Sequence, residues 1–159
     1  GLHTMTAGRL QRVEKYIGDD EEFMLTYGDG VSDVDIKALV DYHHTHDKIA
    51  TVTTVQPAGK FGVLNTNEEG TVTEFVEKPK GGGTWINGGF FVLNRKVFDY
   101  LRDEDMTPIM WEDAPMRSLV ADNELVSYKH DGFWKCMDTL RDNQDLNTLW
   151  DQNPKWRNW

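Results

Sequence analysis

The stretch Phe23-Met24-Leu25-Thr26-Tyr27-Gly28-Asp29-Gly30 decides the fold class of this chain. Its apolar run from Phe23 to Tyr27 is compact and stops at a Gly-Asp-Gly turn, as expected for a buried strand that runs into a turn at its carboxyl end. Open α/β sheets bind their ligands at the carboxyl ends of strands. Asp29 is therefore either an ordinary turn residue or a functional carboxylate.

The flanking sequence predicts helices on both sides of this strand. Apolar residues at helical spacing indicate a helix over residues 9–17, and a capping-box pattern, Ser32 followed by Asp35, begins a second helix that continues to about residue 47. A β-branched, threonine-rich strand over 49–55 comes next. Strand, helix and strand at this spacing predict a βαβ crossover in a parallel sheet.

The remaining chain continues as mixed α/β sequence. We expect a hairpin from 61–64 and 72–76, a strand over 85–94 broken by Gly88-Gly89, helices near 95–101, 111–122 and 139–150, and a strand over 125–129. The prediction is one α/β domain over residues 1–159, a Rossmann-like doubly wound mixed sheet with a small antiparallel insertion.

Composition excludes several classes of protein. The 159 residues carry a net charge of −10 without basic blocks, which argues against nucleic acid and anionic membranes as partners. A single cysteine forms no intrachain disulfide, and no stretch has the roughly 20 apolar residues of a membrane span. We therefore expect a cytoplasmic protein.

Asp138 is the second candidate carboxylate. It follows the last predicted strand and precedes the last helix, where it could simply be a helix N-cap. Asp29 and Asp138 each end an α/β element, so the two can converge on one hard cation such as Mg²⁺, which is bound by one or two carboxylates together with substrate phosphates.

Two further segments are candidates for substrate binding. Glu77-Lys78-Pro79-Lys80 precedes three glycines and offers positive charge to a phosphate, although a solvated surface loop explains it equally simply. Asn87 and Gly88 place an amide beside bare backbone, which suits sugar hydroxyls and also suits a strand bulge.

Other residues that could suggest a catalytic or metal site are expected to be structural. His43, His44 and His46 lie near a helix end without a partner at ligand spacing, so a solvated or capping role is expected. Cys136 has no basic activator and is not expected to be a nucleophile. The tryptophans of the last ten residues are expected to seal a core or a subunit contact.

Four motifs occur in order along nearly the whole chain: Tyr27-Gly28-Asp29-Gly30, residues 75–80, residues 85–93, and Gly132-Phe133-Trp134 followed by residues 137–142. Together they resemble the sugar-phosphate nucleotidylyltransferases, most closely the cytidylyltransferase branch that makes CDP-glucose. The resemblance implies that CTP and glucose 1-phosphate are the substrates, that pyrophosphate is released, and that the enzyme is a homo-oligomer supplying surface polysaccharide synthesis.

The resemblance also implies a role for each matching residue. Asp29 and Asp138 would hold Mg²⁺ and Lys78 would bind the sugar phosphate. Arg9 would lie near the phosphates, although Ala7 stands where the family usually has glycine. The glucose site would be formed by Tyr27, Gly28, Glu77, Asn87 and Gly88.

The chain departs from the family in the nucleotide-binding part. Family members begin with a strand and a glycine-rich loop that cradle the triphosphate and read the base, and neither is found in this sequence. We therefore expect a carboxyl-terminal part of such an enzyme, incomplete at its amino terminus and inactive alone. Three alternatives stay open: a thymidylyl or uridylyl transferase, a non-catalytic sugar-nucleotide-binding module, and a structural protein.

Overall fold

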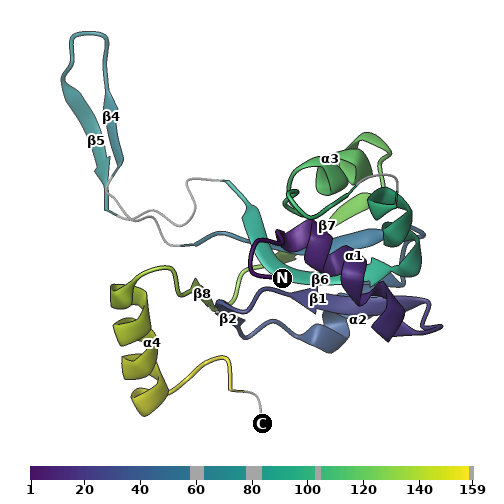
Figure 1. Ribbon diagram of the computed structural model, residues 1–159. Coiled ribbons are helices and arrows are strands. Elements are labelled where there is room, and N and C mark those ends of the chain that lie inside the picture. Colours follow the sequence, from purple (N-terminus) through teal and green to yellow (C-terminus); the bar gives the residue numbers. More distant parts are fainter. Residues whose placement is uncertain (58–62, 78–83, 103–104, 158–159) are drawn as a thin grey trace. The chain divides into compact units, whose positions relative to one another are not determined.

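The computed structural model describes residues 1–57, 63–77, 84–102 and 105–157 (Figure 1). The helices are α1 (Thr6–Ile17), α2 (Ile36–His43), the 3-10 helix η2 (Arg95–Leu101), α3 (Ala114–Ala121) and α4 (Leu140–Gln152). The strands are β1 (Glu22–Thr26), β2 (Gly30–Ser32), β3 (Ala50–Val55), β4 (Val63–Thr66), β5 (Val72–Val76), β6 (Ile86–Asn94), β7 (Leu125–His130) and β8 (Trp134–Cys136). No helix in the described ranges is long and apolar enough to cross a bilayer.

The chain divides into two compact units, each described by itself below. Unit 1 contains Gly1–Tyr27, Asp35–Thr53 and Gly89–Tyr128, and unit 2 contains Gly28–Val34, Thr54–Gly88 and Lys129–Trp159.

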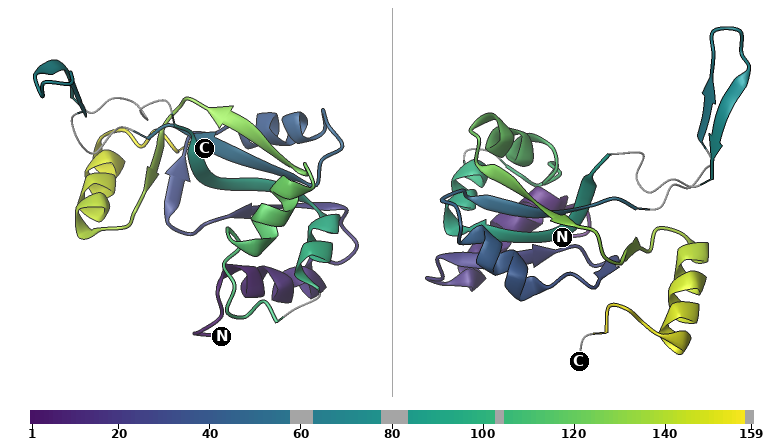
Figure 2. Two further views of the ribbon diagram at one scale, coloured as in Figure 1. Left: turned by 90° about the horizontal axis from the view of Figure 1, so that it is seen from above. Right: turned by 180° about the vertical axis from the view of Figure 1, so that it is seen from behind.

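A four-stranded sheet in the order β1-β6-β3-β7 is the centre of unit 1. β1 pairs antiparallel with β6, with Leu25 opposite Phe91. The strands at 22–26 and 50–55 thus share one sheet, as the predicted crossover requires, but β6 lies between them. Helices cover both faces, with α2 on one side and α1, η2 and α3 on the other (Figure 2), which agrees with a doubly wound α/β fold.

The alternation of side chains along β3 explains why both faces are covered. Ala50 and Val52 point into the main apolar cluster, whereas Thr51 and Thr53 point to the opposite face, and all four are buried. The main cluster is formed by residues from α1, the sheet, η2, α3 and the loop before α3: Ala7, Leu10, Ala50, Val52, Phe91, Leu93, Val97, Phe98, Leu101, Met106, Trp111 and Leu119.

Helix α1 begins earlier than its apolar spacing predicts, because its first turn is attached to the loop before α3. The Met5 amide donates to the Thr107 carbonyl at 2.8 Å and the Ala7 amide to the Ile109 carbonyl at 3.1 Å. A Cβ at Gly8 would lie 2.7 Å from the Met106 carbonyl oxygen. Only glycine allows this approach of helix to backbone.

Helix α2 is capped by Asp35 and not by Ser32. The Asp35 carboxylate accepts from the Ala38 amide at 2.9 Å, whereas Ser32 belongs to β2 and its hydroxyl donates to the Phe133 carbonyl. The predicted capping box is therefore wrong, since the aspartate in its second position is itself the N-cap. The helix also ends at His43, several residues before the predicted limit.

His43 is buried, so its predicted solvated role is wrong. Its Nδ1 lies 2.8 Å from Thr51 Oγ1, which lies 3.1 Å from His46 Nε2. The Lys48 amide donates to His46 Nδ1, so neutral His46 carries its proton on Nε2 and donates it to Thr51. The Thr51 hydroxyl then donates to His43 Nδ1, which is left without a proton.

This chain of hydrogen bonds predicts a loss of stability in acid. Burial, reinforced by His46 and His44 and opposed by Glu22, lowers the pKa of His43. In the unfolded chain the pKa of His43 is about 6.5. Below that pH the unfolded chain therefore binds a proton at His43 more readily than the folded protein does. The contribution of His43 to the free energy of unfolding is complete above about pH 7 and falls as the pH decreases, by at most about 1.4 kcal/mol per pH unit.

Urea unfolding between about pH 7.5 and about pH 5.5 measures this dependence. The matched variant is His43→Asn, whose Oδ1 can accept from Thr51 without titrating. It should have a flatter dependence on pH than the wild type, and equal slopes would contradict the assignment.

Unit 2 contains two small antiparallel pairs and α4. β4 and β5 form the predicted hairpin, with Leu64 opposite Phe75 and both side chains exposed. β2 pairs with β8, a pairing that the sequence analysis did not predict. Trp156 stacks on Phe133 with ring centroids 5.4 Å apart, so this tryptophan packs within unit 2 as a structural residue.

Candidate active site

Asp29 and Asp138 are brought together by the β2 and β8 pair. Gly30 lies opposite Cys136, and the Met137 amide donates to the Asp29 carbonyl at 2.8 Å. This bond continues the ladder beyond β2, so two aspartates that are distant in sequence lie at neighbouring strand ends. Both residues are exposed. The structure thus places the backbone of the two aspartates that the sequence analysis paired at neighbouring strand ends, and their role as metal ligands stays a prediction.

Asp138 is held in place immediately before α4. The helix N-cap is Thr139, whose hydroxyl accepts from the Asp142 amide at 3.1 Å while the Asp142 carboxylate accepts from the Thr139 amide at 3.0 Å. This capping box pairs two amides that a helix start would otherwise leave unpaired. Asp138 is therefore not the N-cap, and its Oδ2 instead accepts from the Cys136 thiol at 3.1 Å.

Cys136 is half-buried beside this carboxylate. Burial, together with the hydrogen bond and negative charge of Asp138, raises the pKa of the Cys136 thiol to about 11. The thiol is therefore protonated at neutral pH and donates to Asp138, which agrees with a residue that is not a nucleophile.

The donor set at Asp29 and Asp138 fits a magnesium ion that is shared with a substrate. Among the residues that the structure describes, no group of three or more His, Cys, Asp or Glu side chains could hold a metal ion. Mg²⁺ usually keeps several waters and binds one or two carboxylates plus substrate phosphates. An ion at these two carboxylates would accordingly need phosphate oxygens to complete its coordination.

Tyr27 follows the last residue of β1 and is half-buried. Its hydroxyl donates to Glu112 Oε1, and its ring meets Phe91 edge to face with centroids 5.8 Å apart. Gly89 has a φ of +81° and lies so close to the ring that a Cβ there would be 2.6 Å from Tyr27 Cδ2. The backbone at Gly89 therefore lies directly against the Tyr27 side chain.

Strand β6 is continuous through Gly88 and Gly89, so the predicted break is wrong. Gly88 is buried and its carbonyl accepts from Trp134 Nε1 at 2.8 Å. Asn87 precedes it and is half-buried. Trp134 lies on β8 four residues before Asp138, so this bond fixes the start of β6 against the strand that leads to the candidate metal ligand.

The remaining predicted site residues are placed as follows. Arg9 lies on α1, is exposed, and donates from Nε to the Thr4 carbonyl at 2.7 Å. Gly28 and Glu77 are exposed. Lys78 lies outside the described residues.

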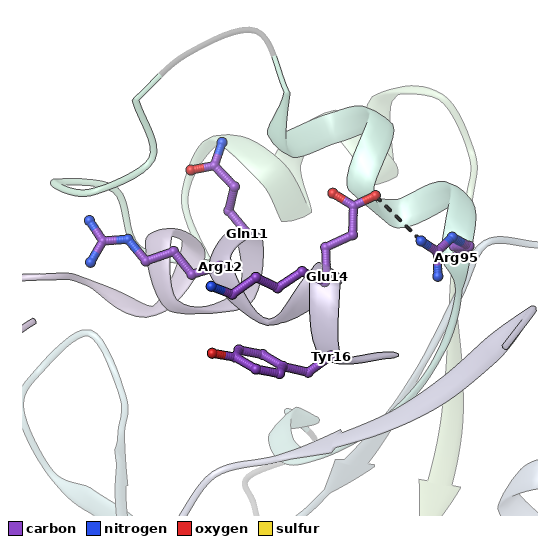
Figure 3. Close-up of a pocket in the computed structure, with 6 residues that line it drawn as sticks. Gln11, Arg12, Glu14, Tyr16 and Arg95 are labelled. Atoms are coloured by element: carbon purple, nitrogen blue, oxygen red, sulfur yellow. Dashed lines mark ion pairs between the residues drawn. The ribbon is translucent and has the colours of Figure 1, made fainter. Parts of the chain in front are cut away.

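Two shallow pockets are formed by other residues. The one in unit 1, of about 580 Å³, lies over α1 and is lined by Gln11, Arg12, Glu14, Lys15, Tyr16 and Arg95. In it Arg95 and Glu14 form an ion pair at 3.8 Å (Figure 3). The one in unit 2 includes Asp33, whose carboxylate is already paired with His130 at 2.8 Å. Neither pocket contains a predicted site residue.

The sequence analysis missed Glu112 and the hydrogen bond of Trp134. Glu112 lies before α3 and carries no motif of its own, so it is distinguished by its contacts with Tyr27 and Thr6, which are distant in sequence. Trp134 was part of a quoted motif, but its partner Gly88 is distant in sequence.

Known proteins are similar in sequence to this chain over most or all of its length. Residues 3–153 match the nucleotidyl transferase family. The chain is 50% identical over 160 residues to the glucose-1-phosphate cytidylyltransferase of Salmonella typhi. It is 34% identical over 135 residues to the mannose-1-phosphate guanyltransferase of Hypocrea jecorina, covering 81% of this chain and 36% of that protein. All of this chain is aligned with the Salmonella relative, and it spans 61% of that protein's length.

Solved structures show the same fold. A Bacillus anthracis structure assigned as a glucose-1-phosphate thymidylyltransferase superimposes with a TM-score of 0.71 at 21% identity, covering 94% of this chain and 62% of that one. The predicted mixed α/β fold class is thereby confirmed. With the family match over nearly its whole length, the chain belongs to the nucleotidyl transferase family.

Proposed function

We propose that the protein transfers a cytidylyl group from CTP to α-D-glucose 1-phosphate, giving CDP-glucose and pyrophosphate. The 50% identity to the Salmonella typhi cytidylyltransferase supports this choice of base and sugar. The observation that carries the chemistry is the β2 and β8 pair, which places Asp29 and Asp138 at neighbouring strand ends.

In this reaction a phosphate oxygen of glucose 1-phosphate attacks the α-phosphorus of CTP. A new P–O bond forms, the bond from the α-phosphorus to the bridging oxygen breaks, and pyrophosphate leaves with the electron pair. Bound Mg²⁺ would neutralise the charge that develops on the phosphates. Asp29 and Asp138 would orient that ion, while Cys136 and the capping box at α4 hold the Asp138 loop.

The sugar half of the site is assigned residue by residue. Lys78 would bind the sugar phosphate as a cation, and Arg9 would lie near the phosphates. Tyr27 would form the floor under the glucose ring. Gly28, Glu77, Asn87 and Gly88 would surround the glucose hydroxyls. A homo-oligomer is part of the same proposal, and light scattering of the purified protein tests it.

A pyrophosphate-release assay tests this function. CTP, UTP, dTTP and ATP are each supplied with Mg²⁺ and glucose 1-phosphate. Two proteins are assayed: the 159-residue chain, and this chain joined to the amino-terminal segment of the Salmonella typhi relative. We expect turnover with CTP only in the joined protein. Turnover by the chain alone would refute its expected inactivity, and a folded joined protein that is silent with every nucleotide would refute the function.

A further inference from the structure

Tyr27 is held by contacts on two sides of its ring and at its hydroxyl. Gly89 lies against the ring, Phe91 meets it edge to face, and the hydroxyl donates to the Glu112 carboxylate. A hydrogen bond from a phenol to an ionised carboxylate is among the stronger ones that proteins make. The phenol is therefore fixed in its direction as well as in its position.

Glu112 is itself fixed by the loop and the helix beside it. Its other oxygen, Oε2, accepts from the Thr6 hydroxyl at 3.3 Å, and Thr6 Oγ1 accepts from the Trp111 amide at 2.7 Å. Trp111 is buried in the main apolar cluster and Thr6 is the first residue of α1. The carboxylate is thus anchored to the core on one side and presents its remaining oxygen to Tyr27.

Tyr27 lies close in sequence to the candidate metal ligand Asp29. It is the residue after β1, and its amide donates to the Gly89 carbonyl at 3.3 Å. Asp29 follows two residues later. A tyrosine that changed its rotamer would alter the aromatic surface at the end of β1, two residues before Asp29.

We propose that Glu112 is a positioning residue for glucose 1-phosphate, acting through the Tyr27 hydroxyl to hold the phenol ring under the sugar. The inference rests on the proposed function, which makes Tyr27 the floor of the glucose site. Glu112 does not itself touch substrate or metal in this proposal. Its effect is therefore on the binding of the sugar phosphate and not on the nucleotide.

The test is a double-mutant cycle measured in the form of the protein that turns over. Glu112→Ala should raise the KM for glucose 1-phosphate about tenfold, with the KM for CTP unchanged and kcat within about twofold. Tyr27→Phe removes the same hydrogen bond and should have a similar effect. Because both changes remove one interaction, the double variant should be no worse than the poorer single variant.

Two further variants separate positioning from general stability. Glu112→Gln keeps an acceptor oxygen and should recover most of the affinity for glucose 1-phosphate. Asp113→Ala removes the neighbouring exposed carboxylate, which forms an ion pair with Arg117 at 3.6 Å, and should leave both KM values unchanged. Circular dichroism confirms that each variant is folded.

The outcomes distinguish a failure of this inference from a failure of the proposed function. A folded joined protein that carries no substitution and turns over no sugar 1-phosphate overturns the proposed function and this inference with it. If the joined protein is active but Glu112→Ala leaves its KM for glucose 1-phosphate unchanged, or the effects of Glu112→Ala and Tyr27→Phe are additive, the role of Glu112 alone is overturned.

Discussion

Replacing Asp138 by asparagine is expected to lower Mg²⁺-dependent turnover by about a thousandfold or more. The change removes one of two carboxylate charges while keeping the shape of the side chain, and a transferred phosphoryl group depends on the metal for neutralisation of its developing charge. Asparagine can still accept from the Cys136 thiol through its amide oxygen, so the local backbone should be preserved. Asp29→Asn should have an effect of similar size.

The measurement combines the pyrophosphate-release assay with calorimetric titration of Mg²⁺ in the presence of CTP. Asp151→Asn is the matched control, because Asp151 is an exposed aspartate near the carboxyl end of α4 and should behave as wild type. An Asp138→Asn protein that retains turnover within about tenfold of wild type would show that this carboxylate does not hold the catalytic ion.

Replacing Phe98 by alanine is expected to lower the free energy of unfolding by about 3–5 kcal/mol. Phe98 has no exposed surface and stacks on Phe23 of β1 with ring centroids 5.4 Å apart. Its removal leaves a cavity between η2 and the sheet, where neighbouring side chains can close the space only in part. The loss is large compared with the usual total stability of a domain.

Urea unfolding followed by circular dichroism measures this loss. Phe75→Ala provides a control of the same residue type, because Phe75 is 60% exposed on the β4 and β5 hairpin. That variant should lose less than about 1 kcal/mol. Equal losses in the two variants would contradict the assignment of Phe98 to the main core.

Most helices and strands could be predicted from the sequence because their signals are local. The β-branched run of β3 and the apolar spacing of α1 are examples. The pairing of β2 with β8 could not be predicted, because each strand has three residues and a strand this short has no readable alternation. The order of the sheet was equally inaccessible, since β6 enters it from a distant part of the chain.

Some residues of the candidate site could likewise be predicted from the sequence, and others could not. Asp29 and Asp138 could be selected because each ends an element, and the resemblance to nucleotidylyltransferases assigned their role. Glu112 could not be selected, because its importance depends on meeting Tyr27 from a distant part of the chain. The burial of His43 was missed because its hydrogen-bond partner, Thr51, lies on strand β3 and not on the same helix.

The short ladder between β2 and β8 makes the site sensitive to the number of residues before Asp138. In a β-strand, successive side chains point to opposite faces, so inserting or deleting one residue reverses the face on which every later side chain emerges. A single-residue deletion between Trp134 and Asp138 would move the Asp138 carboxylate to the opposite face of the β2 and β8 pair while removing no functional group. Turnover should therefore be far less sensitive to substitutions in this strand than to changes in its length. Replacing Lys135 by another residue should cost less activity than deleting it.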